Sequence, residues 1–237
     1  MNIDVKEIMR KERWNYKNAK AYERYMKIFH KAERDFWIET ISKTKAKRVL
    51  DVGAGTGFLS EIALKLGCEV FALDISESML KIAEEKLKNF KGFTSVVGDA
   101  ENLPFKDEYF DLVMSRFVLW TLPNPSKMLS ECLRVLKPNG YLLLANGESK
   151  DGNVFSRIIT NIVDIIVGWR LPTWRKVYKK FDSHLPKWKQ DRVVDELEKL
   201  GTEIENIIDL LKLEGLLYKI LLPYSWHPYC IVGRKRK

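Results

Sequence analysis

The chain has 237 residues, of which 46% are hydrophobic and 31% are charged, and its formal net charge is +9. This length and apolar content are enough for the core of one domain. The chain contains no long uninterrupted apolar run, and its first residues lack the apolar segment of a signal peptide. We therefore expect a soluble, cytoplasmic protein without a transmembrane segment.

The cysteines and histidines show neither metal-ligand spacing nor a disulfide framework. The three cysteines are far apart in the sequence, and the three histidines are equally scattered. We expect Cys68 and Cys132 to behave as small buried apolar groups. His227 is interpreted as a packed loop residue, with a catalytic base as the alternative. No metal is predicted.

Residues 1–42 are predicted to be helical and are rich in aromatic side chains. The next segment is the most informative one: Asp51 to Gly57 reads Asp-Val-Gly-Ala-Gly-Thr-Gly and follows an apolar stretch. After a helical segment, a second apolar stretch ends at Asp74. A strand, a glycine-rich turn, a helix and a second strand that ends in a carboxylate form the half-fold that binds adenosine-containing ligands.

The spacing of these glycines indicates which ligand is bound. They read Gly-x-Gly-x-Gly rather than Gly-x-Gly-x-x-Gly, so they crowd into the turn, where the backbone can approach a ligand and adopt positive φ. Asp51 would repel a pyrophosphate but suits a cationic amino-acid moiety. The pattern therefore favours a sulfonium nucleoside that carries an amino acid over NAD.

Further strands and helices alternate along the chain. A helix is predicted from Ser76, as its N-cap, to Asn89, and another over residues 126–136, with a turn at Asn139-Gly140. Short apolar runs are typical of buried parallel strands, and they occur at Glu69–Leu73, Phe93–Val97, Phe110–Met114 and Tyr141–Leu144. The alternation predicts a doubly wound α/β sheet.

Four motifs in order resemble the class I S-adenosylmethionine-dependent methyltransferases, in particular the ubiquinone/menaquinone biosynthesis branch. They are the glycine turn with Asp74, and residues 98–105, 110–115 and 134–143. The resemblance covers most of residues 47–147. It implies a mostly parallel, seven-stranded Rossmann-like sheet with an antiparallel last strand. It also implies an enzyme of class EC 2.1.1.- that uses S-adenosyl-L-methionine and releases S-adenosyl-L-homocysteine.

The resemblance also implies a set of cofactor-binding residues. Asp74 would accept the ribose hydroxyls, Asp99 and the Ala100 amide would meet the adenine, and Tyr22 would contact the methionine carboxylate. The whole set is Tyr22, Asp51, Gly53, Ala54, Gly55, Asp74, Ile75, Met79, Asp99, Ala100, Ser115 and Arg116. Core packing remains the alternative for Tyr22 and Met79, and a turn or cap role for Asp74 and Asp99.

No catalytic side chain is assigned. The family's frequent His-His-Leu after the fourth strand is replaced here by residues 119–122, so a histidine base at that position is absent. Trp120 instead predicts an apolar or aromatic wall. Methyl transfer from a sulfonium needs mainly alignment of the acceptor and exclusion of water.

The chain is predicted to be one methyltransferase domain with four parts. Residues 1–42 form a helical cap, 45–148 the cofactor-binding core and 149–190 a lid or substrate insertion. Residues 191–237 supply a helix at 191–200 and two last strands at 203–208 and 229–233.

The acceptor is expected to be a small or lipid-like molecule. The segment 169–190 interleaves aromatic and basic side chains, so it could be part of a lid, a membrane-facing surface or an RNA surface. An RNA (tRNA) methyltransferase and a non-catalytic methyltransferase-like binding module are the alternative functions. The oligomeric state is not predicted.

Overall fold

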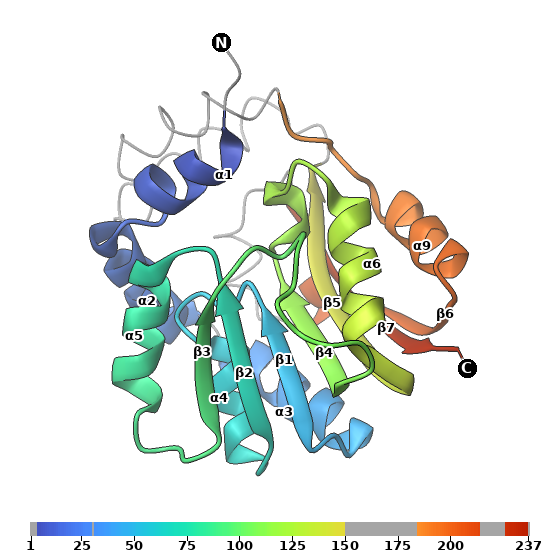
Figure 1. Cartoon of the computed structure of the whole chain (residues 1–237), viewed down its shortest axis with the longest axis horizontal. Helices are drawn as coiled ribbons and strands as arrows, with labels where there is room; N and C mark the ends of the chain where they lie inside the picture. Colours follow the sequence, from blue (N-terminus) through green and yellow to red (C-terminus); the bar gives the residue numbers. More distant parts are fainter. Residues whose placement is uncertain (1–3, 30, 150–183, 214–225, 237) are drawn as a thin grey trace.

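A seven-stranded sheet with helices on both faces forms the centre of the computed structural model, which describes residues 4–29, 31–149, 184–213 and 226–236 (Figure 1). The strand order is β3-β2-β1-β4-β5-β7-β6. Strands β1 to β5 are parallel to one another, and β7 runs antiparallel to both β5 and β6. The predicted doubly wound sheet and its antiparallel last strand are confirmed.

The strands contain the predicted apolar runs, and most are longer than the run that predicted them. They are β1 (Arg48–Val52), β2 (Glu69–Asp74), β3 (Phe93–Val97), β4 (Phe110–Arg116), β5 (Leu136–Ser149), β6 (Thr202–Asp209) and β7 (Trp226–Lys235).

The helices of the described residues are of three kinds. The α-helices are α1 (Val5–Ile8), α2 (Tyr16–Phe29), α3 (Lys31–Thr44), α4 (Phe58–Lys65), α5 (Glu77–Leu87), α6 (Pro125–Val135) and α9 (Gln190–Lys199). A π-helix, η1 (Met9–Arg13), continues α1, and two short 3-10 helices are η2 (Leu119–Thr121) and η4 (Leu210–Lys212).

Local capping explains where two central helices begin. The Ser76 side chain accepts a hydrogen bond from the Met79 amide, which makes Ser76 the N-cap of α5 as predicted. The Asn124 side chain caps α6 in the same way through the Lys127 amide, and Pro125 occupies the first turn.

The core has one layer on each face of the sheet. In Figure 1, α6 and α9 lie in front of the strands, and α3 and α4 lie behind them. Alternate residues of β5 serve the two layers: Leu142 and Leu144 pack in the front core, whereas Leu143 and Ala145 pack in the rear one. The three cysteines are buried free thiols, as expected for Cys68 and Cys132.

Strand β5 is much longer than the predicted Tyr141–Leu144. The turn at Asn139, with φ of 61°, is present, but it lies in an irregularity within the strand, where pairing to β4 jumps from Leu136 to Tyr141. Beyond the predicted end, pairing with antiparallel β7 continues to Ser149. Pairing with β7, which is distant in the sequence, therefore extends β5.

Most of the predicted lid lies outside the described residues, since these omit 150–183. The same holds for residues 169–183 of the basic aromatic segment. In the part that is described, Leu185 packs with Val5 and Met9 of the N-terminal helices, and Trp188 packs against the front core. The four-part division of the chain stays a prediction.

Candidate functional site

Three neighbouring strands bring predicted site residues to one edge of the sheet. Asp51 lies in β1, Asp74 ends β2, and Ser115 and Arg116 end β4. The register places Val52 beside Leu73 on one side and beside Ser115 on the other. The carboxyl ends of parallel strands meet at one edge, so these residues share the position where α/β sheets bind ligands.

The glycine turn is fastened to the neighbouring strand. The amides of Gly53 and Ala54 both donate to the Leu73 carbonyl oxygen, at 2.7 and 3.0 Å. Gly53 and Gly55 have φ of 70° and 56°, in the left-handed region that favours glycine. The positive φ predicted from the sequence is confirmed.

Asp74 is fixed by backbone amides. Its Oδ2 accepts from the Gly55 amide at 2.8 Å, and its Oδ1 accepts from the Ser76 amide at 2.8 Å. The side chain is buried, and loss of hydration raises its pKa to about 6, although these backbone hydrogen bonds act in the opposite direction. The Ile75 amide also interacts with this carboxylate, whose remaining acceptor capacity is available for a ligand hydroxyl.

Asp51 is held by the first turn of α4. Its Oδ2 accepts from the amide and the hydroxyl of Ser60, at 3.0 and 2.6 Å. Burial raises the pKa of Asp51 to about 7, and the nearby charge of Asp74 adds to this rise. Asp51 and Asp74 thus form a pair of buried carboxyl groups beside the glycine turn.

Side chains from three elements cover the glycine turn closely. A Cβ on Gly53 would lie 2.1 Å from Cγ2 of Val118, which follows β4. A Cβ on Gly55 would lie 3.1 Å from Cε of Met79 in α5 and 4.0 Å from Cε1 of Tyr22 in α2. Tyr22 and Met79, both predicted site residues, therefore meet over the turn.

Arg116 is bound to an acid of the N-terminal helices. Its Nε and Nη2 donate to the two carboxylate oxygens of Glu33, at 2.6 and 2.8 Å, and its Nη1 donates to the Tyr22 hydroxyl at 3.3 Å. The side chains of Arg116 and Glu33 are only 7% and 2% exposed. The pair ties α3 to the end of β4.

Ser115 points into the sheet rather than toward a ligand. It is fully buried, and its hydroxyl donates to the Val52 carbonyl oxygen at 2.8 Å. Its contribution at this edge is therefore to join β4 to β1.

The predicted adenine end is built differently. Lys6 of α1 lies 2.6 Å from Oδ2 of Asp99 and 2.6 Å from Oε2 of Glu101. Burial lowers the pKa of Lys6, but these two acids outweigh it and leave the pKa raised. Ala100 is buried beside them, and Ile75 is half-buried after β2. The Asp99 carboxylate, which was predicted to meet the adenine, is therefore paired with Lys6.

Sequence reasoning did not identify Glu33, Lys6 or Val118. For Glu33 a signal exists: Trp37 and Ile41 follow at steps of four residues, so all three share one face of α3, and all are buried. An acid on an apolar helical face indicates a buried partner. No comparable local signal marks Lys6 or Val118.

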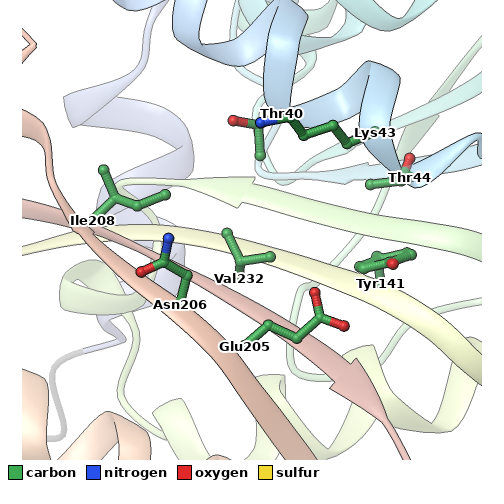
Figure 2. A pocket seen from close by; sticks show the side chains of 8 residues that line it. All are labelled: Thr40, Lys43, Thr44, Tyr141, Glu205, Asn206, Ile208 and Val232. Carbon is green, nitrogen blue, oxygen red and sulfur yellow. The ribbon is translucent and has the colours of Figure 1, made fainter.

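A pocket of about 300 Å³ lies elsewhere, between α3 and strands β5, β6 and β7. Figure 2 shows its lining, which comprises Thr40, Lys43, Thr44, Tyr141, Glu205, Asn206, Ile208 and Val232. None of these is a predicted site residue.

Within the described parts of the chain, no helix is long and apolar enough to cross a membrane. In the same parts, no group of three His, Cys, Asp or Glu side chains could hold a metal ion. His227 lies in β7, opposite Glu148 of β5, and not in a loop as predicted, because the antiparallel pairing reaches back to Trp226.

Comparison with known proteins gives a consistent family. Residues 50–144 match the family described as a methyltransferase domain. A demethylmenaquinone methyltransferase of Renibacterium salmoninarum is 41% identical over 108 residues, which are 46% of this chain and 44% of that protein. A ubiquinone/menaquinone biosynthesis C-methyltransferase of Pectobacterium carotovorum is 38% identical over 121 residues, 48% of each chain. The chain thus spans about half the length of the curated relatives it matches.

Solved structures share the fold at low sequence identity. A phosphoethanolamine N-methyltransferase of Haemonchus contortus in complex with S-adenosyl-L-methionine has a TM-score of 0.67 at 16% identity, covering 100% of this chain and 61% of that one. A putative methyltransferase of Bacillus halodurans has a TM-score of 0.59 at 23% identity, covering 84% and 99%. These structures share the fold of this chain, and its residues 50–144 match the methyltransferase domain family that its sequence motifs resemble.

Proposed function

We propose that this protein transfers a methyl group from S-adenosyl-L-methionine to a small, lipid-like acceptor at the carboxyl edge of the sheet. The observation that carries the proposal is the Asp74 carboxylate, which is held by the Gly55 and Ser76 amides beside a turn of left-handed glycines. Adjacent ribose hydroxyls suit a carboxylate that is fixed in place and keeps acceptor capacity.

The residues at this edge fit the parts of the cofactor in order. Asp74 would hold the ribose. The amino-acid part would lie over Gly53 and Gly55, where missing Cβ atoms allow close approach. Met79 and Ile75 would border the adenine. Asp99 would keep its ion pair with Lys6 and would meet the adenine amino group through an acceptor position that remains on its carboxylate. This assignment supports S-adenosyl-L-methionine over a dinucleotide, since Asp51 places a second acid where a pyrophosphate would be repelled.

When bound, the cofactor supplies the methyl group as an activated electrophile. The chain then has two tasks: it holds the acceptor nucleophile in line with the methyl carbon, and it excludes water. Such positioning can lower a barrier by about 7–11 kcal/mol. Val118, two residues after β4, and Trp120 of η2 would supply an apolar wall for this purpose.

Names of relatives support the acceptor class. Those proteins are called demethylmenaquinone and ubiquinone/menaquinone biosynthesis methyltransferases, and we infer a quinone-like aromatic acceptor for this chain from them. The methyl carbon of a sulfonium is an electrophile, and the thioether leaves with the electrons of the broken S–C bond, so we expect the acceptor to arrive in a reduced, electron-rich form.

Calorimetric titration and a transfer assay test the proposal together. S-adenosyl-L-homocysteine is expected to bind and NAD is not. Radiolabelled methyl groups should then enter a reduced demethylmenaquinone in organic extracts. Equal binding of NAD would contradict the cofactor assignment. Label found in tRNA instead would favour the nucleic-acid alternative, and binding without transfer to either would favour a non-catalytic module.

A further inference from the structure

A buried network joins the N-terminal helices to the glycine turn. Glu33 of α3 accepts two hydrogen bonds from Arg116 at the end of β4, and its Oε1 also accepts from Nε1 of Trp37 at 3.0 Å. Arg116 also lies over the rings of Phe58 and Phe117, with Cζ 5.2 and 4.5 Å from their centroids. The guanidinium is thereby held by hydrogen bonds and by aromatic rings.

The charge of Arg116 is neutralised within the protein. The bidentate contact with Glu33 is the geometry in which arginine and carboxylate bind most strongly. A ligand carboxylate would have to displace Glu33, which is only 2% exposed, and leave a buried acid without its partner. Arg116 is therefore poorly suited to be the direct ligand of the cofactor's carboxylate.

The positive charge of Arg116 can act on a ligand through the Tyr22 hydroxyl. Its hydroxyl accepts from Nη1 of Arg116 at 3.3 Å, so its own proton can be donated. Burial raises the pKa of Tyr22, and the charge of Arg116 offsets this only in part, so the phenol keeps its proton at neutral pH. A hydroxyl that accepts from a cation is a stronger donor. The Tyr22 ring also borders the site of the missing Gly55 Cβ.

We propose that Glu33 is a positioning residue: it holds Arg116 so that Arg116 orients and polarises the Tyr22 hydroxyl, which binds the carboxylate of the cofactor's amino-acid part. This inference rests on the proposed function, because it concerns the same ligand. It adds two residues of α3 and β4 that act on the ligand through a third.

A pair of related ligands separates this role from a structural one. S-adenosyl-L-homocysteine carries the amino acid, whereas 5′-methylthioadenosine has the same adenine, ribose and thioether without it. Tyr22→Phe is expected to weaken the binding of S-adenosyl-L-homocysteine at least about tenfold, because a hydrogen bond to a charged group is lost. Glu33→Gln should weaken it about three- to tenfold. Binding of 5′-methylthioadenosine should stay unchanged in both.

The control and a double variant complete the test. Glu39→Gln removes an acid from the same helix, where Glu39 pairs with Lys43 at the exposed surface, and should change neither affinity. If Glu33 acts through Tyr22, adding Glu33→Gln to Tyr22→Phe should cause no further loss. Should Glu33→Gln fail to fold, Glu33→Met with Arg116→Met removes both charges, restores folding and still lacks the selectivity for the amino acid.

Three results would overturn the inference: equal weakening of both ligands, no weakening of either, or additive losses in the double variant. Failure of the proposed function is a separate outcome. In that case the unaltered protein would bind neither ligand, and the positioning role would fall with it.

Discussion

The carboxylates at the two ends of the candidate cofactor site differ in burial and in the groups that bind them. At the ribose and amino-acid end, Asp51 and Asp74 are buried and held by the amides of Ser60, Gly55 and Ser76. At the predicted adenine end, Asp99 is 32% exposed and pairs with Lys6, which is 31% exposed. Amides of the glycine turn and of the starts of α4 and α5 thus hold the buried end, whereas at the other end Asp99 is held by Lys6 of the first helix as well as by the Glu101 amide.

This difference predicts how each end responds to change. Buried carboxylates in a sheet edge are insulated from salt and depend on the fold, whereas partly exposed ion pairs contribute little and are screened. Substitutions near the glycine turn should therefore have large effects. Those around Lys6 should have small, salt-dependent ones.

The largest effect is expected from Gly53→Ala. The new Cβ would lie 2.1 Å from Val118 Cγ2 at a φ of 70°, so strain and overpacking should together lower the free energy of unfolding by about 2–4 kcal/mol. Gly67→Ala is the matched control, because Gly67 has a φ of 84° with nothing within 4 Å. Urea unfolding should show that the control lowers the free energy of unfolding by only about 1–2 kcal/mol. Equal losses of stability in the two variants would mean that the close packing of Val118 against Gly53 does not increase the cost of the substitution.

The next largest effect compares the two ends of the site by their contributions to ligand binding. Asp74→Ala should weaken binding of S-adenosyl-L-homocysteine by about 1.5–3 kcal/mol, because hydrogen bonds to a charged group are lost. Asp99→Ala should cost less than half of that, since Asp99 already pairs with Lys6. Calorimetric titration of both variants measures the two ends on one scale. An equal loss would show that the adenine end is as well formed as the other.

A third prediction concerns pH. Asp74 has a pKa raised to about 6 and must be ionised to accept two hydroxyls, so affinity for S-adenosyl-L-homocysteine should rise about tenfold from pH 5 to pH 7. In Asp74→Asn the rise should be absent. The sign for stability is opposite: a carboxyl with a raised pKa stabilises the folded state when protonated, and this contribution is lost as pH increases through about 6. Unfolding of the ligand-free protein across the same range should show that loss.

The smallest effect is expected from Lys6→Ala. The pair of Lys6 with Asp99 is partly exposed, and such pairs contribute about 0.2–1 kcal/mol. Glu101, the second partner of Lys6, is only 7% exposed but keeps a hydrogen bond from the Asn124 amide, so the free energy of unfolding should fall by about 1 kcal/mol, the upper end of this range. The loss should shrink when salt is raised to about 1 M, where charges are screened over a few ångströms. The contrast is Glu33→Gln, whose destabilisation should not depend on salt because the pair is buried. A large, salt-independent loss for Lys6→Ala would remove the distinction between the ends.

Local chemistry explains what could be read from the sequence. Glycine spacing and apolar runs predicted the turn, the order of strands and helices and the position of Asp74, since each depends on residues close together in the chain. The Ser76 cap is another example, as its acceptor and the Met79 amide are three residues apart. The family resemblance then supplied the topology of the last two strands.

Tertiary structure decided which side chains meet. The length of β5 depends on β7, some eighty residues later, and the state of Arg116 depends on Glu33, 83 residues earlier. Lys6 and Asp99 are 93 residues apart. A sequence pattern reports the face on which a residue lies, but not the partner that the opposite element presents there. The sequence therefore determined the elements and the ligand turn, whereas the charges around that turn were set by packing of the N-terminal helices against the sheet.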